Sequence, residues 1–437
     1  MARFLIGTVP VIGHVNPGIP IARQLIQKGH EVWWYTGQAF QSKIEAIGAT
    51  FVPMVNALDY SNPAAIPQAL IDQRNRLSGL AQLKSDLKTF FVDSIPGQVQ
   101  DYLDVISVIK PDLLLSDSLF LGPAWVHELQ GIPWAQFGSS VLTMPSADTA
   151  PFGLGLAPTN TYWGKLRNRG LYWLLKKVIF RDVLDHINQV RATFKLPQTD
   201  CGIFDVLSPF LYLAGTVPEF EYPRQDCPPQ VHFVGPLLPE PPADFTPPDW
   251  WSDLQKNLPI IHVTQGTVTT TADQLILPTL QGLAEENVLV VATTGGQPID
   301  SISPELVPKN ARIATFLPHH YLLPHVDVMV TNGGYNGVQI ALSHGVPLVA
   351  AGKTEDKIEV CARIAWAGVG INLKTQYPTA TQIRSAVQTL LSDPSYRSRA
   401  QALQREMRNY NAARRSVELL EKLVETQRPV LNATPRH

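Results

Sequence analysis

A proline-rich stretch near the middle of the chain constrains the fold more than any other feature. Six prolines lie between Phe233 and Trp251. Proline has no backbone N–H and a fixed φ, so this stretch cannot be a central strand or a helix, and it predicts a stiff, extended linker. On both sides of it, short apolar runs alternate with helical segments, which is the βαβ pattern of parallel sheets covered by helices. We therefore expect an N-terminal domain over 1–235, a linker over 236–250 and a second domain over 251–410.

Each half of the chain predicts a doubly wound, Rossmann-like α/β domain. In the first half, a strand over Arg3–Gly7 is followed by a loop over Thr8–Asn16, and a helix is expected to begin at Pro17, a residue type that favours the first turn. Ligands of such sheets bind beyond the carboxyl ends of the strands. Two facing domains would therefore form a cleft between their strand ends.

The segment Thr331–Gly352 follows an apolar run, Val326–Val330, that reads as a buried strand, and it contains a glycine turn, a helix over Tyr335–His344 and a second strand over Val346–Ala351. Gly333 and Gly334 let backbone N–H groups approach a ligand closely, and the helix start at Tyr335 leaves N–H groups unpaired and carries partial positive charge. We interpret this turn as the site of a nucleotide-sugar diphosphate. The alternative is an ordinary strand–helix turn.

His14 and Asp117 are the candidate acid–base pair. His14 follows the first strand and Asp117 follows the strand Leu113–Leu115, so both lie at the carboxyl edge of the same predicted sheet. A carboxylate beside an imidazole fixes its tautomer and stabilises the imidazolium, which suits a general base acting on an acceptor hydroxyl. Taken singly, His14 could bond to backbone and Asp117 could cap the helix over Leu119–Gln130.

Further candidates lie at strand ends in the second half. Gly266, Thr267 and Asn336 could donate hydrogen bonds to phosphate, and Phe316 could stack on a base or pack in the core. Glu355, Asp356 and Lys357 follow the strand Val346–Ala351. The two carboxylates could bind sugar hydroxyls, although Asp356 could instead cap the next helix.

Composition excludes several classes of protein. Thirty-five basic residues against 37 acidic ones give a net charge of −2, which provides no electrostatic case for nucleic acid. Three widely spaced cysteines fit a reduced compartment and neither a disulfide framework nor a zinc site. No apolar run reaches the ~20 residues that cross a bilayer. We expect a cytoplasmic protein with no metal site.

A basic, aromatic segment over 162–181 is ambiguous. It mixes Trp163, Tyr172 and Trp173 with lysines and arginines. Such a helix could lie on a membrane surface. The reading that we prefer is that its aromatic side chains pack inward and its charges face water, and a third is a lid over an apolar acceptor.

The chain resembles family 1 glycosyltransferases of the two-domain GT-B fold, in particular bacterial natural-product and macrolide glycosyltransferases and plant flavonoid glucosyltransferases. The resemblance runs almost end to end through GHVNP, GHEV, PDLLLSD, FLPHHYLLP, NGGYNGVQIALSHGVPLV and TEDK, in that order. It implies an inverting transfer without a metal, with His14 as the base and Asp117 as its partner. It also implies that Phe316 stacks on the base, that His319 lies near the base's edge, and that the helix over 411–427 returns to the first domain. The donor-site residues expected in all are Gly266, Thr267, Phe316, His319, Asn332, Gly333, Gly334, Asn336, Gly337, Glu355, Asp356 and Lys357.

Three positions depart from the family pattern. Asn332 stands where these enzymes usually have histidine, so the phosphate motif has an amide without positive charge. Ile340 stands where a glutamate often binds the ribose hydroxyls, which opens the site to dTDP-sugars as well as UDP-sugars. Lys357 replaces the glutamine of the usual acidic–glutamine pair, so the sugar could be a deoxysugar instead of glucose.

The sequence therefore predicts an enzyme that moves a sugar from a nucleotide-sugar co-substrate, with no other cofactor, to a hydroxyl of a small, largely apolar acceptor. One alternative is a sugar-nucleotide epimerase on the same fold. Another is a non-catalytic relative that binds a partner enzyme, which the departures at Asn332 and Ile340 would favour and the presence of His14 and Asp117 opposes.

Overall fold

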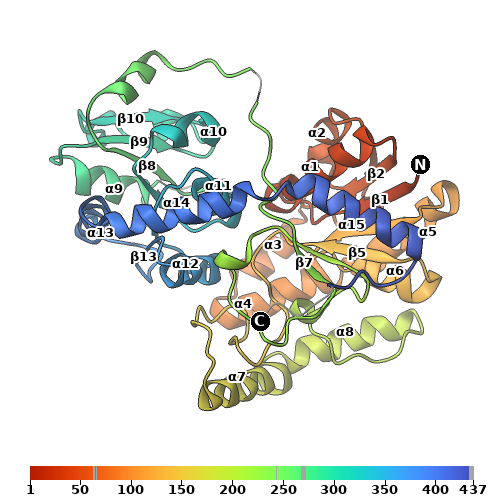
Figure 1. The fold of residues 1–437 in the computed structure, drawn as a ribbon. Helices are drawn as coiled ribbons and strands as arrows, with labels where there is room; N and C mark the ends of the chain where they lie inside the picture. The colour runs from red at the N-terminus through yellow and green to blue at the C-terminus, as the bar shows by residue number, and fades with distance from the viewer. Residues whose placement is uncertain (63, 65, 243, 267–271, 433–437) are drawn as a thin grey trace.

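The computed structural model describes residues 1–437 except 63, 65, 243, 267–271 and 433–437. It contains two parallel sheets, one of seven strands in the order β3-β2-β1-β4-β5-β6-β7 and one of six in the order β10-β9-β8-β11-β12-β13 (Figure 1). The predicted fold class, two doubly wound α/β units of the GT-B kind, is confirmed. The strands of the first sheet are β1 Arg3–Gly7, β2 Glu31–Thr36, β3 Thr50–Pro53, β4 Leu113–Asp117, β5 Trp134–Phe137, β6 Tyr212–Ala214 and β7 Val231–Phe233. Those of the second are β8 Ile260–Thr264, β9 Leu289–Thr293, β10 Ala311–Ala314, β11 Val328–Thr331, β12 Leu348–Ala350 and β13 Gly370–Asn372.

Helices cover both faces of each sheet, because the central strands are apolar on both sides. Buried clusters on the two faces of the first sheet contain alternate residues of β1, with Phe4 and Ile6 on one face and Leu5 on the other. The α-helices of the first half are α1 Ile12–Gln27, α2 Gln41–Glu45, α3 Gln68–Asn75, α4 Gly79–Asp86, α5 Ile95–Ile109, α6 Gly122–Gln130, α7 Tyr162–Leu174 and α8 Arg181–Thr193. Those of the second half are α9 Ile276–Leu283, α10 His319–Leu322, α11 Tyr335–Ser343, α12 Lys357–Trp366, α13 Ala380–Ser392, α14 Pro394–Arg408 and α15 Ala412–Thr426.

The start of α1 differs from the sequence-based expectation. The predicted loop over Thr8–Asn16 is wrong, because α1 begins at Ile12 and carries Pro17 and Pro20 inside it. His14 therefore lies in the first turn of a helix. Proline inside a helix removes the hydrogen bond to the carbonyl four residues earlier, which for Pro17 is that of Gly13. The helix tolerates this loss because the Gly13 carbonyl is bonded from outside the helix, as described below.

The chain passes between the two halves at two places. From β7 it runs without regular structure, in the described residues, to a 3₁₀ segment at Asp249–Gln255. It returns between α14 and α15, since α14 packs on α11 whereas α15 packs on α1 (Figure 1). The two passages lie close together, because a Cβ built on Gly235 would lie 2.3 Å from Cβ of Tyr410. The φ of +90° at Gly235 also favours glycine there. In the part of the chain that the structure describes, no helix is both long and apolar enough to cross a bilayer.

Candidate functional site

His14 and Asp117 meet at the carboxyl edge of the first sheet. β1 and β4 are adjacent parallel strands, so the residues that follow them share one edge. Asp117 is the last residue of β4, and its Oδ1 lies 2.9 Å from Nδ1 of His14 in the first turn of α1. The two halves of the candidate acid–base pair are therefore in hydrogen-bond contact.

Asp117 is fully buried and is held as an acceptor. Its Oδ2 accepts from the Val9 N–H at 2.7 Å, and its Oδ1 accepts from the Leu119 N–H at 2.9 Å as well as from His14. It does not cap α6, which begins later, at Gly122. Three donors stabilise the ionised carboxylate. His14 thus carries its hydrogen on Nδ1, and its Nε2 keeps a free lone pair.

The electrostatics around His14 favour protonation during a reaction. Burial alone would lower the pKa of His14, but the charge of Asp117, its hydrogen bond and the more distant Asp356 together raise that pKa above its usual value. A base with a raised pKa accepts a proton from a hydroxyl more readily.

Two serines that the sequence reasoning missed complete this edge. Ser139 and Ser140 follow β5, the next strand beyond β4. Oγ of Ser139 lies 3.0 Å from Nδ1 of His14, and Oγ of Ser140 donates to Oδ2 of Asp356 from the second half. The rule that located Asp117, a polar residue directly after a central strand, also applies to these serines.

The glycine turn of the second half lies between β11 and α11. Gly333 has a φ of +83°, and a Cβ there would lie 2.5 Å from Sγ of Cys361, so only glycine fits. The Asn332 side chain braces the turn, because its Oδ1 accepts from the Gly334 N–H at 3.2 Å and its Nδ2 donates to the Gln265 carbonyl. Gly337 lies in the first turn of α11, and a Cβ there would meet only Cε of Met329, at 4.0 Å.

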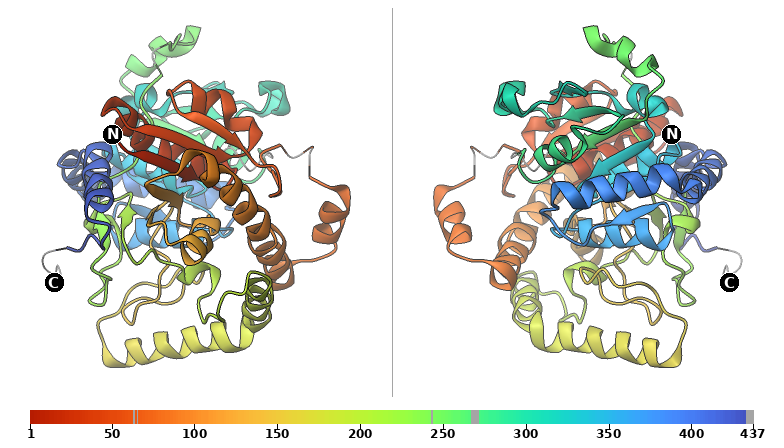
Figure 2. Two further views of the ribbon diagram at one scale, coloured as in Figure 1. Left: turned by 90° about the vertical axis from the view of Figure 1, so that its right-hand side faces the viewer. Right: turned by 90° about the vertical axis from the view of Figure 1, so that its left-hand side faces the viewer.

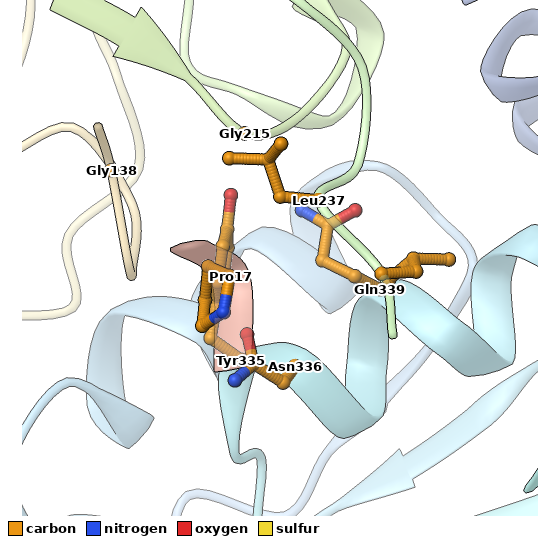
Figure 3. Close-up of a pocket in the computed structure, with 8 residues that line it drawn as sticks. Pro17, Gly138, Gly215, Leu237, Tyr335, Asn336 and Gln339 are labelled. Atoms are coloured by element: carbon orange, nitrogen blue, oxygen red, sulfur yellow. The ribbon is translucent and has the colours of Figure 1, made fainter. Parts of the chain in front are cut away.

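Asn336, also in the first turn of α11, reaches across to the first half. Its Nδ2 donates to the Gly13 carbonyl at 3.1 Å. That carbonyl lacks a helical partner because Pro17 has no N–H. Figure 3 shows Pro17 and Asn336 beside each other at a hollow between the halves, with Gly138, Gly215 and Gln339 around it. A residue expected to bind phosphate thus also ties the donor half to the turn that carries His14.

Two aromatic residues near the end of β10 suit a nucleobase. The Phe316 side chain is 66% exposed, so it is a free surface and not a core residue. His319 is the first residue of α10, and its Nε2 lies 3.4 Å from Nε2 of His262. Burial lowers the pKa of His262 to about 4 and that of His319 to about 3, so both rings are neutral at neutral pH.

Because both rings are neutral, each carries a hydrogen on only one of its two nitrogens, and the hydrogen-bond partners show which one. Nδ1 of His262 lies 3.0 Å from the Val291 carbonyl, which can only accept, so His262 carries its hydrogen on Nδ1. Nε2 of His262 must then accept from Nε2 of His319. Nδ1 of His319 is left as an acceptor, the group needed to bind a base N–H.

Glu355, Asp356 and Lys357, at the start of α12, make two separate sets of contacts. Lys357 Nζ pairs with Glu355 and bonds Oγ1 of Thr354 at 3.2 Å. Asp356 makes no cap bond to α12 and instead faces Ser140 across the cleft. Burial raises its pKa, against the opposing effects of Ser140 and His14. Asp356 thus lies near the candidate base, while Glu355 is oriented toward the lysine.

The second half also contains a hollow, lined mostly by polar residues, beside the glycine turn. It has about 260 Å³ of empty space, part of it open to solvent. Gly266, which has a φ of +78°, lies two residues beyond the end of β8, and Thr267 lies outside the described residues. The hollow is lined by Gln265, Gln274, Leu275, Asn332, Ala351, Gly352, Thr354, Lys357 and Gln376. Across the described residues, no group of three or more His, Cys, Asp or Glu side chains is arranged to hold a metal ion.

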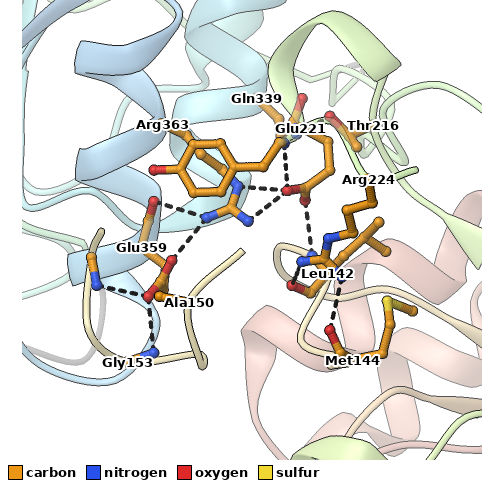
Figure 4. Close-up of polar contacts among 12 residues, drawn as sticks. Leu142, Met144, Ala150, Gly153, Thr216, Glu221, Arg224, Gln339, Glu359 and Arg363 are labelled. Carbon is orange, nitrogen blue, oxygen red and sulfur yellow. Dashed lines mark hydrogen bonds and ion pairs between the residues drawn. The ribbon is translucent and has the colours of Figure 1, made fainter. Parts of the chain in front are cut away.

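A buried ionic network joins the halves next to this site. Arg363 of α12 donates to Glu221 of the first half and to Glu359, and its guanidinium lies 4.0 Å from the centre of the Tyr222 ring (Figure 4). Glu359 accepts from the N–H groups of Gly153 and Gly155, at 2.9 and 2.8 Å. The network therefore holds the loop that follows Ser140 against the helix that follows Asp356.

Comparisons with known proteins agree with this architecture. Residues 278–425 match the family model described as erythromycin biosynthesis protein CIII-like, C-terminal domain. The chain is 44% identical to the 4'-demethylrebeccamycin synthase of Lentzea aerocolonigenes, over 97% of this chain and all of that protein. It is 33% identical to UDP-glycosyltransferase 2 of Phaeomoniella chlamydospora, over 92% of this chain and 91% of that protein. The crystal structure of the glycotransferase of kitacinnamycin superposes with a TM-score of 0.75 at 21% identity, over 97% of this chain and 99% of that one.

Proposed function

This chain belongs to the erythromycin CIII-like, GT-B glycosyltransferases, and from that premise we propose that it moves a sugar from a UDP- or dTDP-sugar to a hydroxyl of a small, largely apolar natural product. The resemblance drawn from the sequence is confirmed, and so is the assignment as a glycosyltransferase. The proposal extends to the mechanism, which is a single displacement with inversion at the anomeric carbon and without a metal ion.

One observation carries the proposal: the His14–Asp117 pair faces the α11 N-terminus, and the bond from Asn336 to the Gly13 carbonyl connects them. Nε2 of His14 takes the proton of the acceptor hydroxyl, and the oxygen bonds to the anomeric carbon. The bond from that carbon to the diphosphate oxygen breaks, and its electron pair leaves with the diphosphate. Asp117 stabilises the imidazolium that forms.

The departing diphosphate needs positive potential, which the protein supplies. The N-terminus of α11 offers unpaired N–H groups and its dipole, and Asn332 and Asn336 beside it carry amide donors that would exchange their present bonds for phosphate. Lys357, which pairs with Glu355 in the structure, would bring a positive charge to the same edge by leaving that partner. These groups support a transfer that does not depend on a divalent cation. Activity that persists in excess EDTA would agree with this, and activity restored only by Mg²⁺ or Mn²⁺ would contradict it.

Phe316 and His319 form the proposed base site. Phe316 offers an exposed ring for stacking, and the acceptor Nδ1 of His319 suits the N3–H of uracil or thymine. Ile340 supplies no acceptor for a ribose hydroxyl, so we propose that the protein accepts both UDP and dTDP. Equal binding of the two nucleotides, within about threefold by calorimetry, would support this reading. A strong preference for UDP would require a ribose acceptor at another position.

The decisive experiment is a product assay with a panel of UDP- and dTDP-sugars and hydroxylated polycyclic acceptors. We expect a glycoside with inverted anomeric configuration, identified by mass and by NMR coupling constants. A donor converted to its epimer with no acceptor present would identify a sugar-nucleotide epimerase instead. Failure to bind UDP or dTDP at millimolar concentration would favour a non-catalytic protein.

A further inference from the structure

α7 lies lengthwise along the lower edge of the molecule, away from the two sheets (Figure 2). The preferred reading of its sequence, that the aromatic side chains pack inward, is wrong for both tryptophans. Trp163 is 75% exposed and Trp173 is 63% exposed. Leu166 and Leu174 are exposed as well, and at helical spacing these four side chains share one outer stripe.

The opposite face of α7 fixes this orientation. Asn168 is fully buried and donates to the Ala147 carbonyl at 2.9 Å, and the hydroxyl of Tyr172 reaches the Ala150 carbonyl at 3.4 Å. The helix also begins with a formed cap, because the Thr161 side chain accepts from the Gly164 N–H. The apolar stripe is thus held outward by a packed inner face.

The charge of this segment differs from that of the rest of the chain. Residues 162–181 contain six basic side chains and no acidic one, a net of +6 in a chain whose total is −2, so the remaining residues carry −8. Lys165, Lys177 and Arg181 pair with Asp148, Asp200 and Asp185. Arg167 and Arg169, which flank the stripe, have no carboxylate partner in the described residues.

These features together specify the partner. Tryptophans that are about 15 Å apart along a helix, at 1.5 Å per residue, with leucines between them and arginines at the sides, match a helix lying in the headgroup layer of a membrane. An apolar stripe does not suit nucleic acid, and two arginines without a carboxylate partner, of which Arg167 bonds only the neutral Asn168 amide, favour an anionic surface. We propose that α7 holds this protein on the surface of membranes that contain anionic lipid, without crossing them.

Vesicle flotation tests this proposal. The full chain is mixed with 100 nm vesicles of phosphatidylcholine, with or without 30% phosphatidylglycerol. We expect binding to the anionic vesicles that weakens as salt rises. Trp163→Ser/Trp173→Ser should lower the partition coefficient at least tenfold, and Arg167→Gln/Arg169→Gln should lower it roughly twenty- to thirtyfold, at about a factor of five per charge.

Matched controls use exposed residues outside α7. Val108→Ser/Tyr377→Ser and Arg384→Gln/Arg405→Gln should bind vesicles as the wild type does. Circular dichroism confirms that each variant is folded. Because α7 is separate from His14 and the donor turn, glycosyl transfer to a water-soluble acceptor should be unchanged in the α7 variants, so this proposal can fail without affecting the proposed reaction.

Three results would overturn the proposal. Wild-type protein that remains unbound at low salt would do so, and so would α7 variants that bind like the controls. A concentration-dependent dimer in sedimentation velocity that the tryptophan variant abolishes, with no vesicle binding, would instead assign the stripe to a second copy of the chain.

Discussion

The two sides of the cleft, that of His14 and that of the glycine turn, differ in how far their side chains are already arranged for the proposed reaction. On the acceptor side, Asp117 already has three donors and already orients His14, so nothing must move before a proton is taken. On the donor side, the side chains expected to meet the nucleotide-sugar bond to protein: Asn332 to Gln265, Asn336 to Gly13, and Lys357 to Glu355. A preorganised base and a donor site that must exchange hydrogen bonds imply that donor binding is the step that reorganises the cleft.

The largest expected effect is a loss of kcat that leaves nucleotide binding on the other side of the cleft unchanged. His14→Ala should lower kcat by two to four orders of magnitude if His14 is the general base that we propose, while the Kd for UDP or dTDP should change by less than about twofold. His186→Ala is the matched control, because His186 forms the same kind of pair with Asp93 on the surface of α8. Initial rates and calorimetry measure the two quantities. A large change in nucleotide affinity would show that the sides are not independent.

The next largest effect is a loss of stability when the buried Arg363 network between the two halves is broken. Arg363→Met leaves Glu221 and Glu359 buried without their cation, and it should lower the free energy of unfolding by about 3–5 kcal/mol in urea titration. Glu221→Gln/Glu359→Gln/Arg363→Met should recover much of that loss, because no buried charge remains. Arg414→Met, which breaks an exposed pair with Glu418, should cost no more than about 1 kcal/mol. Equal losses for Arg363→Met and Arg414→Met would mean that the interface is not a stabilising core.

The Asp117→Asn variant tests, through the pH dependence of kcat/KM, whether Asp117 controls the pKa of His14. In the wild type the charge and hydrogen bond of the carboxylate outweigh burial and hold the pKa of His14 above its usual value, so we expect the rate to rise with pH as His14 loses its proton. Removing the charge lowers that pKa, so the acidic limb of the kcat/KM profile should move to lower pH. The plateau should also fall, roughly tenfold or more, because the tautomer is no longer fixed. A limb that does not move would remove Asp117 as the cause.

The smallest effects test whether the donor side exchanges bonds. Pro17→Ala restores an N–H for the Gly13 carbonyl and so competes for the bond that Asn336 makes. If Asn336 must leave that carbonyl to meet phosphate, nucleotide should bind up to about fivefold tighter, the value of one hydrogen bond. Asn336→Ala should weaken nucleotide binding by a similar factor. Unchanged affinity in Pro17→Ala would show that one amide serves both partners, and the contrast between the sides would then be smaller.

The sequence brought His14 and Asp117 together as a candidate pair because strand order is a local pattern, and the structure places the two side chains in contact. Residues at or beyond the carboxyl ends of β1 and β4 had to share an edge, and the same rule would have found Ser139 and Ser140 after β5. It failed at the start of α1, since Pro17 is typical of a first turn. The helix instead begins five residues earlier, because Asn336, 323 residues away in the chain, bonds the carbonyl that proline leaves free.

Other parts of the site could not be derived from local sequence. Nothing around Glu221 or Arg363 indicates that they pair, because their contact depends on how two domains dock. The exposure of Trp163 and Trp173 likewise depends on which face of α7 meets the loop at Ala147 and Ala150. The domain boundaries and the assignments of individual donor residues stay predictions, to be tested by the variants above.

The contact between Gly235 and Tyr410 has a mechanical consequence. The polypeptide passes twice from one lobe to the other, and the two passages lie close together at this point, with no room for a Cβ on Gly235. Two abutting crossovers favour rotation over sliding, so if the bonds of Arg363 and Asn336 across the interface opened, the lobes would turn about this point. The proposed acceptor and donor pockets would then separate by an angular swing, and the greatest travel would occur at the rim farthest from residue 235.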